Sequence, residues 1–333
     1  MKAIFLCEKT DTVFCVYDSR TVCELQALIE IEKIRYTKAD VLRDPALFCD
    51  VEIIFSTWGM PEFTEEEIRS CFPSLKCVFY GAGTVQAFAR PFLACNVKVF
   101  SAWAANAVPV AELTVSQIVL ANKGYFLTNR LYHTRGQRSA DEAFRGCRGN
   151  YGETVGIIGA GMVGKLVIKM LKQYRLNVLV FDPFLSDEKA KELGVEKCEL
   201  PDLFAKAFVV SNHLANNEQT RGMLRYDLFR RMRKNAVFIN TGRGAQVVEE
   251  DLVRVLLERP DLTALLDVTY PEPPAEGHPF YTLPNCYLTP HIAGSAGDEV
   301  ARMGEYMLCE CRAYLSDQPT RYEVSEKMLE TMA

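Results

Sequence analysis

The sequence predicts an α/β protein built from two successive doubly wound parallel-sheet domains. Short apolar runs rich in Val, Ile and Phe recur along the 333 residues and alternate with segments of helical periodicity. The runs contain few polar residues, which is typical of parallel strands covered by helices on both faces. A chain of this length accommodates about two domains.

Four apolar runs in the first part of the chain predict the strands of the first domain. They are KAIFLC, VEIIFST, LKCVFY and VKVFSA, which begin at residues 2, 51, 75 and 97. Between them, Thr64 and Glu67 stand at the spacing of a capping box, so we interpret the acidic run 65–67 as a helix start and not as an acidic site. The first domain is expected to end near residue 103.

Five further runs predict the strands of the second domain. They are TVGIIG, NVLVFD, FVVSNH, NAVFIN and LTALLDV, which begin at residues 154, 177, 208, 235 and 262. A long helix is expected at 110–126, before the first of these strands, and a final helix at 299–315.

Composition excludes several classes of protein. The net charge of -5 argues against a general nucleic-acid binder, because neutralising phosphates requires clustered Lys and Arg. No run approaches the roughly 20 apolar residues needed to cross a bilayer, and acidic residues follow the start too soon for a signal sequence. We therefore expect a cytoplasmic protein without a nucleic-acid or membrane partner.

The 12 cysteines contain no CxxC pair, and the chain has only four histidines. Zinc is therefore not expected, and no metal site is predicted. The cysteines fall mostly in apolar segments, so we expect buried reduced thiols and not a disulfide framework.

A glycine motif follows the first strand of the second domain. Gly159, Gly161 and Gly164 stand in GxGxxG spacing after TVGIIG, and they open the predicted helix GMVGKLVIKMLKQY. The first glycine permits a tight turn, the second a close approach of a pyrophosphate, and the third close helix packing. The amides of the helix start, at Met162 and Val163, suit a bound anion.

Asp182 ends the next strand of the second domain. Its carboxylate would accept hydrogen bonds from the adenosine ribose hydroxyls and repel the additional phosphate of NADP. The sequence therefore predicts NAD as the cofactor.

Three further segments follow in order: NTGRG at 240–244, DVTYPEP at 267–273 and TPHIAG at 289–294. In this order behind the glycine motif, they resemble the D-isomer-specific 2-hydroxyacid dehydrogenase family. The resemblance extends over about residues 75–315, includes Asn106 and the helix segment VAEL at 110–113, and is strongest at 152–294. It implies an NAD-dependent oxidoreductase that interconverts a small 2-oxo acid and its D-2-hydroxy acid.

The chemistry of this reaction explains the residue types. The Arg243 guanidinium is a permanently charged fork that can hold the substrate carboxylate and carbonyl. The His291 imidazole can donate and accept a proton near neutral pH. The Glu272 carboxylate would orient this ring and stabilise its charged form.

The resemblance also assigns binding residues. It implies cofactor contacts, besides the glycine loop, by His213, Ala215, Thr220, Thr241, Gly242 and Asp267. For His213 a structural role at a strand end is an equal alternative. It implies substrate contacts, with Arg243, by Tyr80, Gly81 and Ala82. His133 and His278 are expected at the surface.

The match to the family is weaker in the first domain. Thr84-Val85-Gln86-Ala87 replace the polar residues that usually follow the glycine-rich substrate loop, so the sequence does not identify the 2-oxo acid or the physiological direction. Trp103 is interpreted as a packing residue at the hinge, with a pocket-lining role as the alternative.

The family resemblance also implies the architecture. A Rossmann NAD domain at 104–294 and a smaller flavodoxin-like substrate domain, 1–103 plus 295–333, would enclose an interdomain cleft. A homodimer is expected, with the 110–146 arm as its interface. The alternative function is an NAD-sensing scaffold, since corepressors of the same fold exist in the family.

Overall fold

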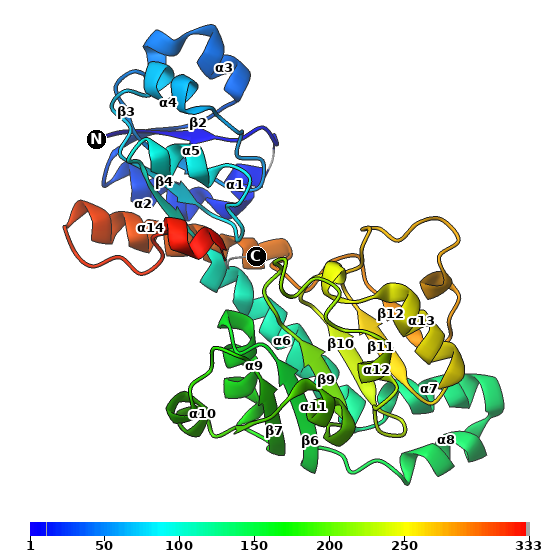
Figure 1. The fold of residues 1–333 in the computed structure, drawn as a ribbon. Helices are drawn as coiled ribbons and strands as arrows, with labels where there is room; N and C mark the ends of the chain where they lie inside the picture. The colour runs from blue at the N-terminus through cyan, green and yellow to red at the C-terminus, as the bar shows by residue number, and fades with distance from the viewer. Residues whose placement is uncertain (11, 331–333) are drawn as a thin grey trace. The chain divides into compact units, whose positions relative to one another are not determined.

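The computed structural model describes residues 1–10 and 12–330, which fall into two compact units. Unit 1 contains residues 1–106 and the returning segment from Ser295 onward, and unit 2 contains Ala107–Gly294. The division near residue 106 lies close to the boundary predicted at residue 103. In Figure 1 unit 1 is blue to cyan with the red C-terminal helix, and unit 2 is green to orange.

Unit 1 is built on a five-stranded parallel sheet of order β2-β1-β3-β4-β5. This is a flavodoxin-like order, in which the second strand lies outside the first. The strands are β1 (Lys2–Leu6), β2 (Glu30–Tyr36), β3 (Val51–Ser56), β4 (Cys77–Tyr80) and β5 (Lys98–Ser101). The four predicted strands are confirmed, while β2 was not predicted.

Helices cover both faces of the unit 1 sheet. Successive strand residues point to opposite faces, so the apolar strands contribute to two separate cores. Ile54 and Val78 contribute to one core with α3 (Lys38–Arg43), α4 (Glu65–Cys71) and α5 (Ala89–Ala94). Phe55 and Phe79 contribute to the other core with α1 (Thr12–Val16), α2 (Ser19–Gln26) and α14 (Ala301–Leu315). The predicted capping box at Thr64 and Glu67 begins α4.

Unit 2 is built on a seven-stranded parallel sheet of order β12-β11-β10-β9-β6-β7-β8. The order reverses between β6 and β9, as in the Rossmann fold. The strands are β6 (Tyr151–Ile158), β7 (Arg175–Phe181), β8 (Glu196–Lys197), β9 (Val209–Asn212), β10 (Val237–Asn240), β11 (Thr263–Leu266) and β12 (Cys286–Leu288). The five predicted strands are confirmed, and the short edge strands β8 and β12 were not predicted.

The unit 2 sheet is also covered on both faces (Figure 1). One face packs against α11 (Leu200–Lys206), α12 (Tyr226–Phe229) and α13 (Glu249–Glu258). The other face packs against α6 (Trp103–Asn122) and α9 (Met162–Leu171). The remaining helices are α7 (Tyr125–Arg135), α8 (Gln137–Phe144) and α10 (Asp187–Leu193).

Helix α6 is long and apolar enough to cross a membrane by length and composition alone. Half of its most apolar window is buried, and Ala111, Ile118 and Ala121 belong to the unit 2 core. A core helix of a folded domain passes the same length and composition test, so this helix is weak evidence for a membrane span.

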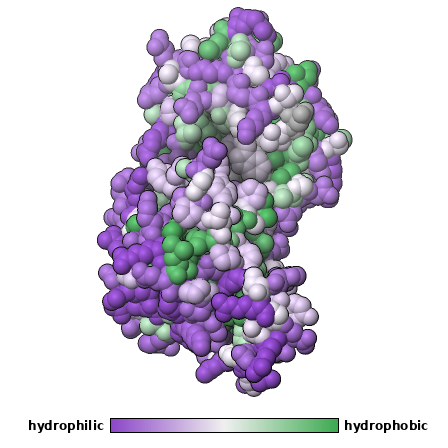
Figure 2. Space-filling model, turned by 90° about the vertical axis from the view of Figure 1, so that its right-hand side faces the viewer, coloured by the Kyte–Doolittle hydropathy of each residue, from purple (hydrophilic) through white to green (hydrophobic). Residues whose placement is uncertain are grey.

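The exposed large side chains include Tyr125, Tyr132 and Phe144 on α7 and α8. These helices form the predicted dimerisation arm, and the homodimer stays a prediction. The face of the molecule in Figure 2 is largely hydrophilic, with hydrophobic residues in separate patches.

The cysteines differ from the expectation. Only Cys7, Cys71, Cys77 and Cys311 are buried, while Cys15, Cys23, Cys49 and Cys309 are exposed. Cys95, Cys147, Cys198 and Cys286 are intermediate in exposure. The prediction that they are generally buried was wrong, because several lie on the solvent side of amphipathic helices and turns.

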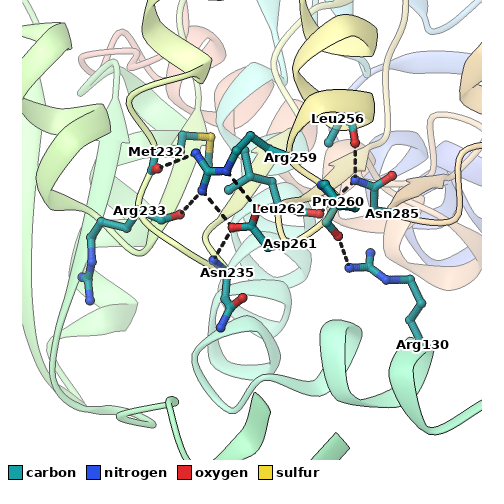
Figure 3. Close-up of polar contacts among 10 residues, drawn as sticks. All are labelled: Arg130, Met232, Arg233, Asn235, Leu256, Arg259, Pro260, Asp261, Leu262 and Asn285. Carbon is teal, nitrogen blue, oxygen red and sulfur yellow. Dashed lines mark hydrogen bonds and ion pairs between the residues drawn. The ribbon is translucent and has the colours of Figure 1, made fainter. Parts of the chain in front are cut away.

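The amino ends of β10, β11 and β12 are joined by a dense polar network (Figure 3). Arg259 donates to both oxygens of Asp261, at 2.9 and 2.8 Å, and Asp261 also accepts the Asn235 N–H. Asn285 donates to the carbonyl oxygens of Leu256 and Leu262. This network connects the turns at the amino edge of the sheet.

Candidate active site

The glycine loop between β6 and α9 has the geometry that its spacing predicted. Gly159 has a φ of +90°, and a Cβ there would lie 2.7 Å from the His213 carbonyl oxygen. A Cβ on Gly164 would lie 2.0 Å from the Gly159 carbonyl oxygen. Side chains are therefore excluded at both positions by the turn and by the close approach of α9.

Gly161 differs, since nothing lies within 4 Å of the position of its Cβ. It is the N-cap of α9 and makes no side-chain capping hydrogen bond. The first amides of the helix, at Met162 and Val163, therefore face an open position beside the helix N-terminus, which favours an anion. This arrangement fits a dinucleotide pyrophosphate.

Asp182 follows β7 at the same edge of the sheet. Its Oδ2 accepts the Ala160 N–H at 2.6 Å, and its Oδ1 accepts the Phe184 N–H at 2.8 Å. The carboxylate is thus fixed against the glycine loop. Each oxygen keeps a second lone-pair direction for a ribose hydroxyl.

His213 follows β9, which lies next to β6 at the point where the strand order reverses. Its Nε2 lies 2.9 Å from the Ser211 Oγ and its Nδ1 lies 3.5 Å from the Thr241 Oγ1. Burial lowers the pKa of this imidazole to about 3, so the ring is neutral at neutral pH. Both ring nitrogens thus have hydroxyl neighbours, and the cofactor contact predicted for this residue stays a prediction.

The other predicted cofactor residues lie on neighbouring loops. Thr241 is buried, and its hydroxyl lies 3.1 Å from that of Thr114 in α6. The Thr220 hydroxyl donates to the Ala215 carbonyl at 2.6 Å and is thus engaged within its own loop.

Arg243 stands in the turn after β10, where its main chain is held on both sides. Its N–H donates to the Gln246 Oε1 at 3.2 Å, and its carbonyl accepts from the Asn240 Nδ2 at 3.2 Å. Asn212 donates to the side-chain oxygens of both Asn240 and Gln246.

Gln246 extends this network to the loop that follows β9. It is fully buried, and its Nε2 donates to the carbonyls of Leu214 and Ala215 at 2.8 and 2.9 Å. Sequence reasoning missed these positioning residues. The available signal was a polar residue at the end of each apolar strand, Asn212 and Asn240, which are paired in the sheet register.

The guanidinium of Arg243 is largely withdrawn from solvent. Burial lowers its pKa, and the negative charge of Glu272 acts in the opposite direction. One of its nitrogens, Nη1, donates to the Gly242 carbonyl at 2.8 Å. Its remaining N–H groups have no hydrogen-bond acceptor among the described residues, so they are available to an anionic ligand.

Gly244 brings the Arg243 turn against the segment that carries Glu272. A Cβ on Gly244 would lie 2.0 Å from the Thr269 carbonyl carbon, so only glycine allows this approach. Glu272 lies in the loop after β11 and His291 lies after β12. Their side chains meet, with 2.6 Å between the His291 Nδ1 and the Glu272 Oε1.

His291 has a φ of +55°, an uncommon conformation for a residue with a side chain. Asp267 maintains it. The Asp267 carbonyl accepts the His291 N–H. The Asp267 Oδ1 accepts the Ile292 N–H and the Thr289 hydroxyl, and its Oδ2 accepts the Ala293 N–H. In the structure, therefore, Asp267 binds the loop that carries His291, and its predicted cofactor contact stays a prediction.

In unit 1 the predicted substrate loop follows β4. The Thr57 hydroxyl donates to the Gly81 carbonyl, and the Ser101 hydroxyl donates to the carbonyls of Ala82 and Gly83. Thr57 and Ser101 are buried positioning residues that sequence reasoning also missed. By fixing these carbonyls, they determine the direction of the neighbouring amides.

The ring of Tyr80 is buried against Phe88, and burial raises the pKa of Tyr80 to about 12. Trp103 packs edge-on against Tyr322, with 5.5 Å between ring centroids, within unit 1. This contact matches the packing role expected for Trp103.

No group of three or more His, Cys, Asp or Glu is placed to hold a metal ion in the part of the chain that the structure describes.

Comparison with known proteins identifies the unit that carries these residues. The family model described as D-isomer specific 2-hydroxyacid dehydrogenase, NAD binding domain, matches residues 118–293. This range contains the glycine loop, Arg243, Glu272 and His291.

Relatives with sequence similarity include a D-3-phosphoglycerate dehydrogenase of Methanocaldococcus jannaschii, 31% identical over 65% of this chain and 40% of the relative. A glyoxylate reductase of Korarchaeum cryptofilum is 35% identical over 46% of this chain and 47% of the relative. The chain thus spans less than half the length of these two curated relatives.

Solved structures share the fold over nearly the whole chain. A phosphoglycerate oxidoreductase from Rhizobium etli has a TM-score of 0.81 at 20% identity and covers 98% of this chain and 99% of its own. The apo form of D-mandelate dehydrogenase from Rhodotorula graminis has a TM-score of 0.81 at 18% identity and covers 98% of both chains.

Proposed function

The chain belongs to the D-isomer specific 2-hydroxyacid dehydrogenase family, and we propose that it interconverts a small 2-oxo acid and its D-2-hydroxy acid with NAD(H). The observation that carries this proposal is the 2.6 Å contact between His291 and Glu272, on the same sheet edge as Arg243. A cation, a proton donor and a carboxylate that orients the donor are the groups this reduction requires.

The cofactor, when bound, supplies the hydride that is added to carbon 2 of the substrate. The first amides of α9, at Met162 and Val163, would hold its pyrophosphate beside Gly161, and Asp182 would hold the adenosine ribose. His213, Ala215, Thr220, Thr241, Gly242 and Asp267 form the rest of the proposed cofactor contacts. Asp182 is the basis for proposing NAD over NADP.

His291 supplies the proton in this mechanism. Because Glu272 occupies Nδ1 of the ring, Nε2 is the nitrogen left to exchange a proton with the substrate oxygen. As the carbonyl gains the hydride, its oxygen takes the Nε2 proton, and the positive charge of the imidazolium is removed. In the oxidative direction the neutral ring takes the hydroxyl proton back.

Arg243 binds the substrate carboxylate and polarises its carbonyl through the N–H groups left available by its environment. In unit 1, the amides of Gly81 and Ala82 are the proposed carboxylate donors, with Tyr80 preceding them. The homodimer and the cytoplasmic location remain part of this proposal.

The test is NADH oxidation in the presence of a panel of 2-oxo acids, monitored by absorbance for the wild type and for Arg243→Lys. We expect turnover of at least one 2-oxo acid, and a weaker response with Arg243→Lys because Lys cannot reproduce the two-pronged contact. Saturable NADH binding without turnover of any 2-oxo acid would support an NAD-sensing scaffold and reject the dehydrogenase.

A further inference from the structure

Glu272 lies in a loop with little secondary structure of its own. The segment Tyr270–His278 has the sequence YPEPPAEGH, so three of its residues are prolines without an N–H donor. Its internal backbone hydrogen bonding is a turn in which the His278 N–H donates to the Ala275 carbonyl at 3.0 Å. The position of Glu272 must therefore depend on contacts with other parts of unit 2.

Glu249 makes such a contact at the beginning of the loop. Its Oε1 accepts the Tyr270 N–H at 2.8 Å, two residues before Glu272. Glu249 is the first residue of α13, whose residues Leu252, Val255 and Leu256 are buried in the unit 2 core. A carboxylate on a helix that is anchored in this way is a fixed point for the loop.

The same carboxylate faces the end of the loop. The His278 Nε2 lies 3.8 Å from the Glu249 Oε2, and the His278 Nδ1 accepts the Phe280 N–H at 3.3 Å. Because Nδ1 accepts, Nε2 is the ring nitrogen left to carry an N–H, and this atom is on the Glu249 side of the ring. His278 was expected at the surface, and its side chain is partly buried there, with 19% exposed.

The carboxyl group of Glu249 is buried, unlike that of a typical surface glutamate. Its side chain is 8% exposed, and burial raises its pKa to about 7. The neighbouring Glu250, in contrast, is exposed. A buried carboxyl group is unfavourable unless its hydrogen bonds are made, and the Tyr270 N–H provides one.

We propose that Glu249 is a positioning residue for the reaction, which fixes the start of the Tyr270–His278 loop through the Tyr270 N–H, faces its end at His278, and thereby holds Glu272 against His291. The contacts form one continuous path, from the unit 2 core through α13 and Glu249 to the loop and the imidazole. This role rests on the proposed function of Glu272 and His291, and it adds to that function the residue through which their distance is maintained.

The test compares Glu249→Leu, Glu249→Gln and the matched control Glu250→Leu on the same helical turn. Leu leaves the Tyr270 N–H without an acceptor, whereas the Gln carbonyl oxygen can still accept it. We expect kcat to fall about 10- to 100-fold in Glu249→Leu, because small misplacements of catalytic groups have effects of this size. Glu249→Gln should recover most of the loss, and Glu250→Leu should retain wild-type turnover.

A double-mutant cycle separates positioning from general destabilisation. If Glu249 acts through Glu272, Glu249→Leu should change kcat by less than about 2-fold in a Glu272→Gln background, and NADH affinity should be unchanged in every variant. An equal loss of kcat in both backgrounds, or unchanged kcat in Glu249→Leu alone, would overturn the proposal.

A second readout does not depend on turnover. The chain has only four histidines, so the ring-nitrogen NMR signals of His291 can be assigned with substituted variants. We expect Glu249→Leu to move these signals to their positions in Glu272→Gln, while Glu249→Gln leaves them near wild type. Wild-type signals in Glu249→Leu would overturn the positioning role, whereas lack of turnover in the wild type would overturn only the proposed function.

Discussion

The two edges of the unit 2 sheet are both rich in polar side chains, but they use them differently. At the amino edge, Arg259 binds both oxygens of Asp261 and reaches the carbonyls of Met232 and Arg233 (Figure 3). At the carboxyl edge, the Arg243 guanidinium makes one hydrogen bond within the part of the chain that the structure describes, to its neighbour Gly242. Arg259 and Arg243 are both half-buried, but they differ in how many of their N–H donors already have acceptors in the protein.

The difference separates structural polar groups from reactive ones. A network whose donors and acceptors are satisfied stabilises the turns it joins. Donors without protein partners stabilise nothing by themselves, and a positive φ such as that of His291 is unfavourable. Unpartnered donors and strained residues are found where a ligand uses them. Donors without protein acceptors on a rigid support therefore indicate the site better than the number of polar side chains does.

The largest expected effect concerns His291 at the carboxyl edge. His291→Asn removes the proton donor, so kcat should fall about 100- to 10,000-fold. NADH affinity and the free energy of unfolding should remain close to wild type, because His291 is about half exposed and outside the core. Steady-state kinetics, NADH titration and urea unfolding measure the three quantities.

His133→Asn is the matched control for this change, because His133 is an exposed residue of α7. It should leave kcat unchanged. If His291→Asn lowered stability and turnover in parallel, His291 would belong with the structural groups and the contrast between the edges would fail.

The next effect concerns Arg259 at the amino edge. Arg259→Leu leaves Asp261 without its main partner, and we expect a loss of about 2 to 3 kcal/mol in the free energy of unfolding. The kcat of the folded enzyme should not change. Arg254→Leu, on the exposed side of α13, is the control and should leave the free energy of unfolding close to wild type. If Arg259→Leu lowered kcat under conditions where all of the protein is folded, the distinction between a structural amino edge and a reactive carboxyl edge would be wrong.

Much of this arrangement was predictable from the sequence, for identifiable reasons. Buried parallel strands are continuous apolar runs, so nine of them were located. The edge strand β2 was missed because its sequence EIEKIRY alternates charged and apolar residues, and β8 and β12 are too short for a pattern. Arg243, Glu272 and His291 were located by local motifs and by family resemblance.

The supports of these residues could not be predicted in the same way. Gln246 and Glu249 act through hydrogen bonds to backbone groups of other loops, at Leu214, Ala215 and Tyr270. Such partners are remote along the chain and carry no side-chain signature. The partial burial of His278 was not predicted for the same reason, since its approach to Glu249 arises only from the fold.

His213 sharpens the comparison, because it lies at the carboxyl edge yet has both ring nitrogens near hydroxyl groups. Its pKa is lowered to about 3 by burial, below the value of about 6.5 in an unfolded chain. The unfolded state therefore binds more protons between these pH values, and stability is lost as pH falls below about 6.5.

For this single group the expected loss between pH 7 and pH 5 is about 2 kcal/mol. His213→Gln should remove that part of the pH dependence, which urea unfolding at both pH values measures. The exposed His133→Gln should retain it. Identical pH dependence in wild type and His213→Gln would mean that the ring is not held neutral by burial.

The smallest expected effect concerns Asp182, whose oxygens are only partly occupied by the amides of Ala160 and Phe184. Asp182→Asn keeps a carbonyl acceptor but removes the charge that would repel the additional phosphate of NADPH. At contact distance in water this repulsion is about 1 kcal/mol per charge pair, so the ratio of NADPH to NADH affinity should rise about 10-fold. Asp187→Asn, an exposed residue of α10 paired with Lys197, should leave the ratio unchanged. If the ratio did not move in Asp182→Asn, the carboxylate would serve only to hold the glycine loop, and Asp182 would join Asp261 among the structural carboxylates of the sheet.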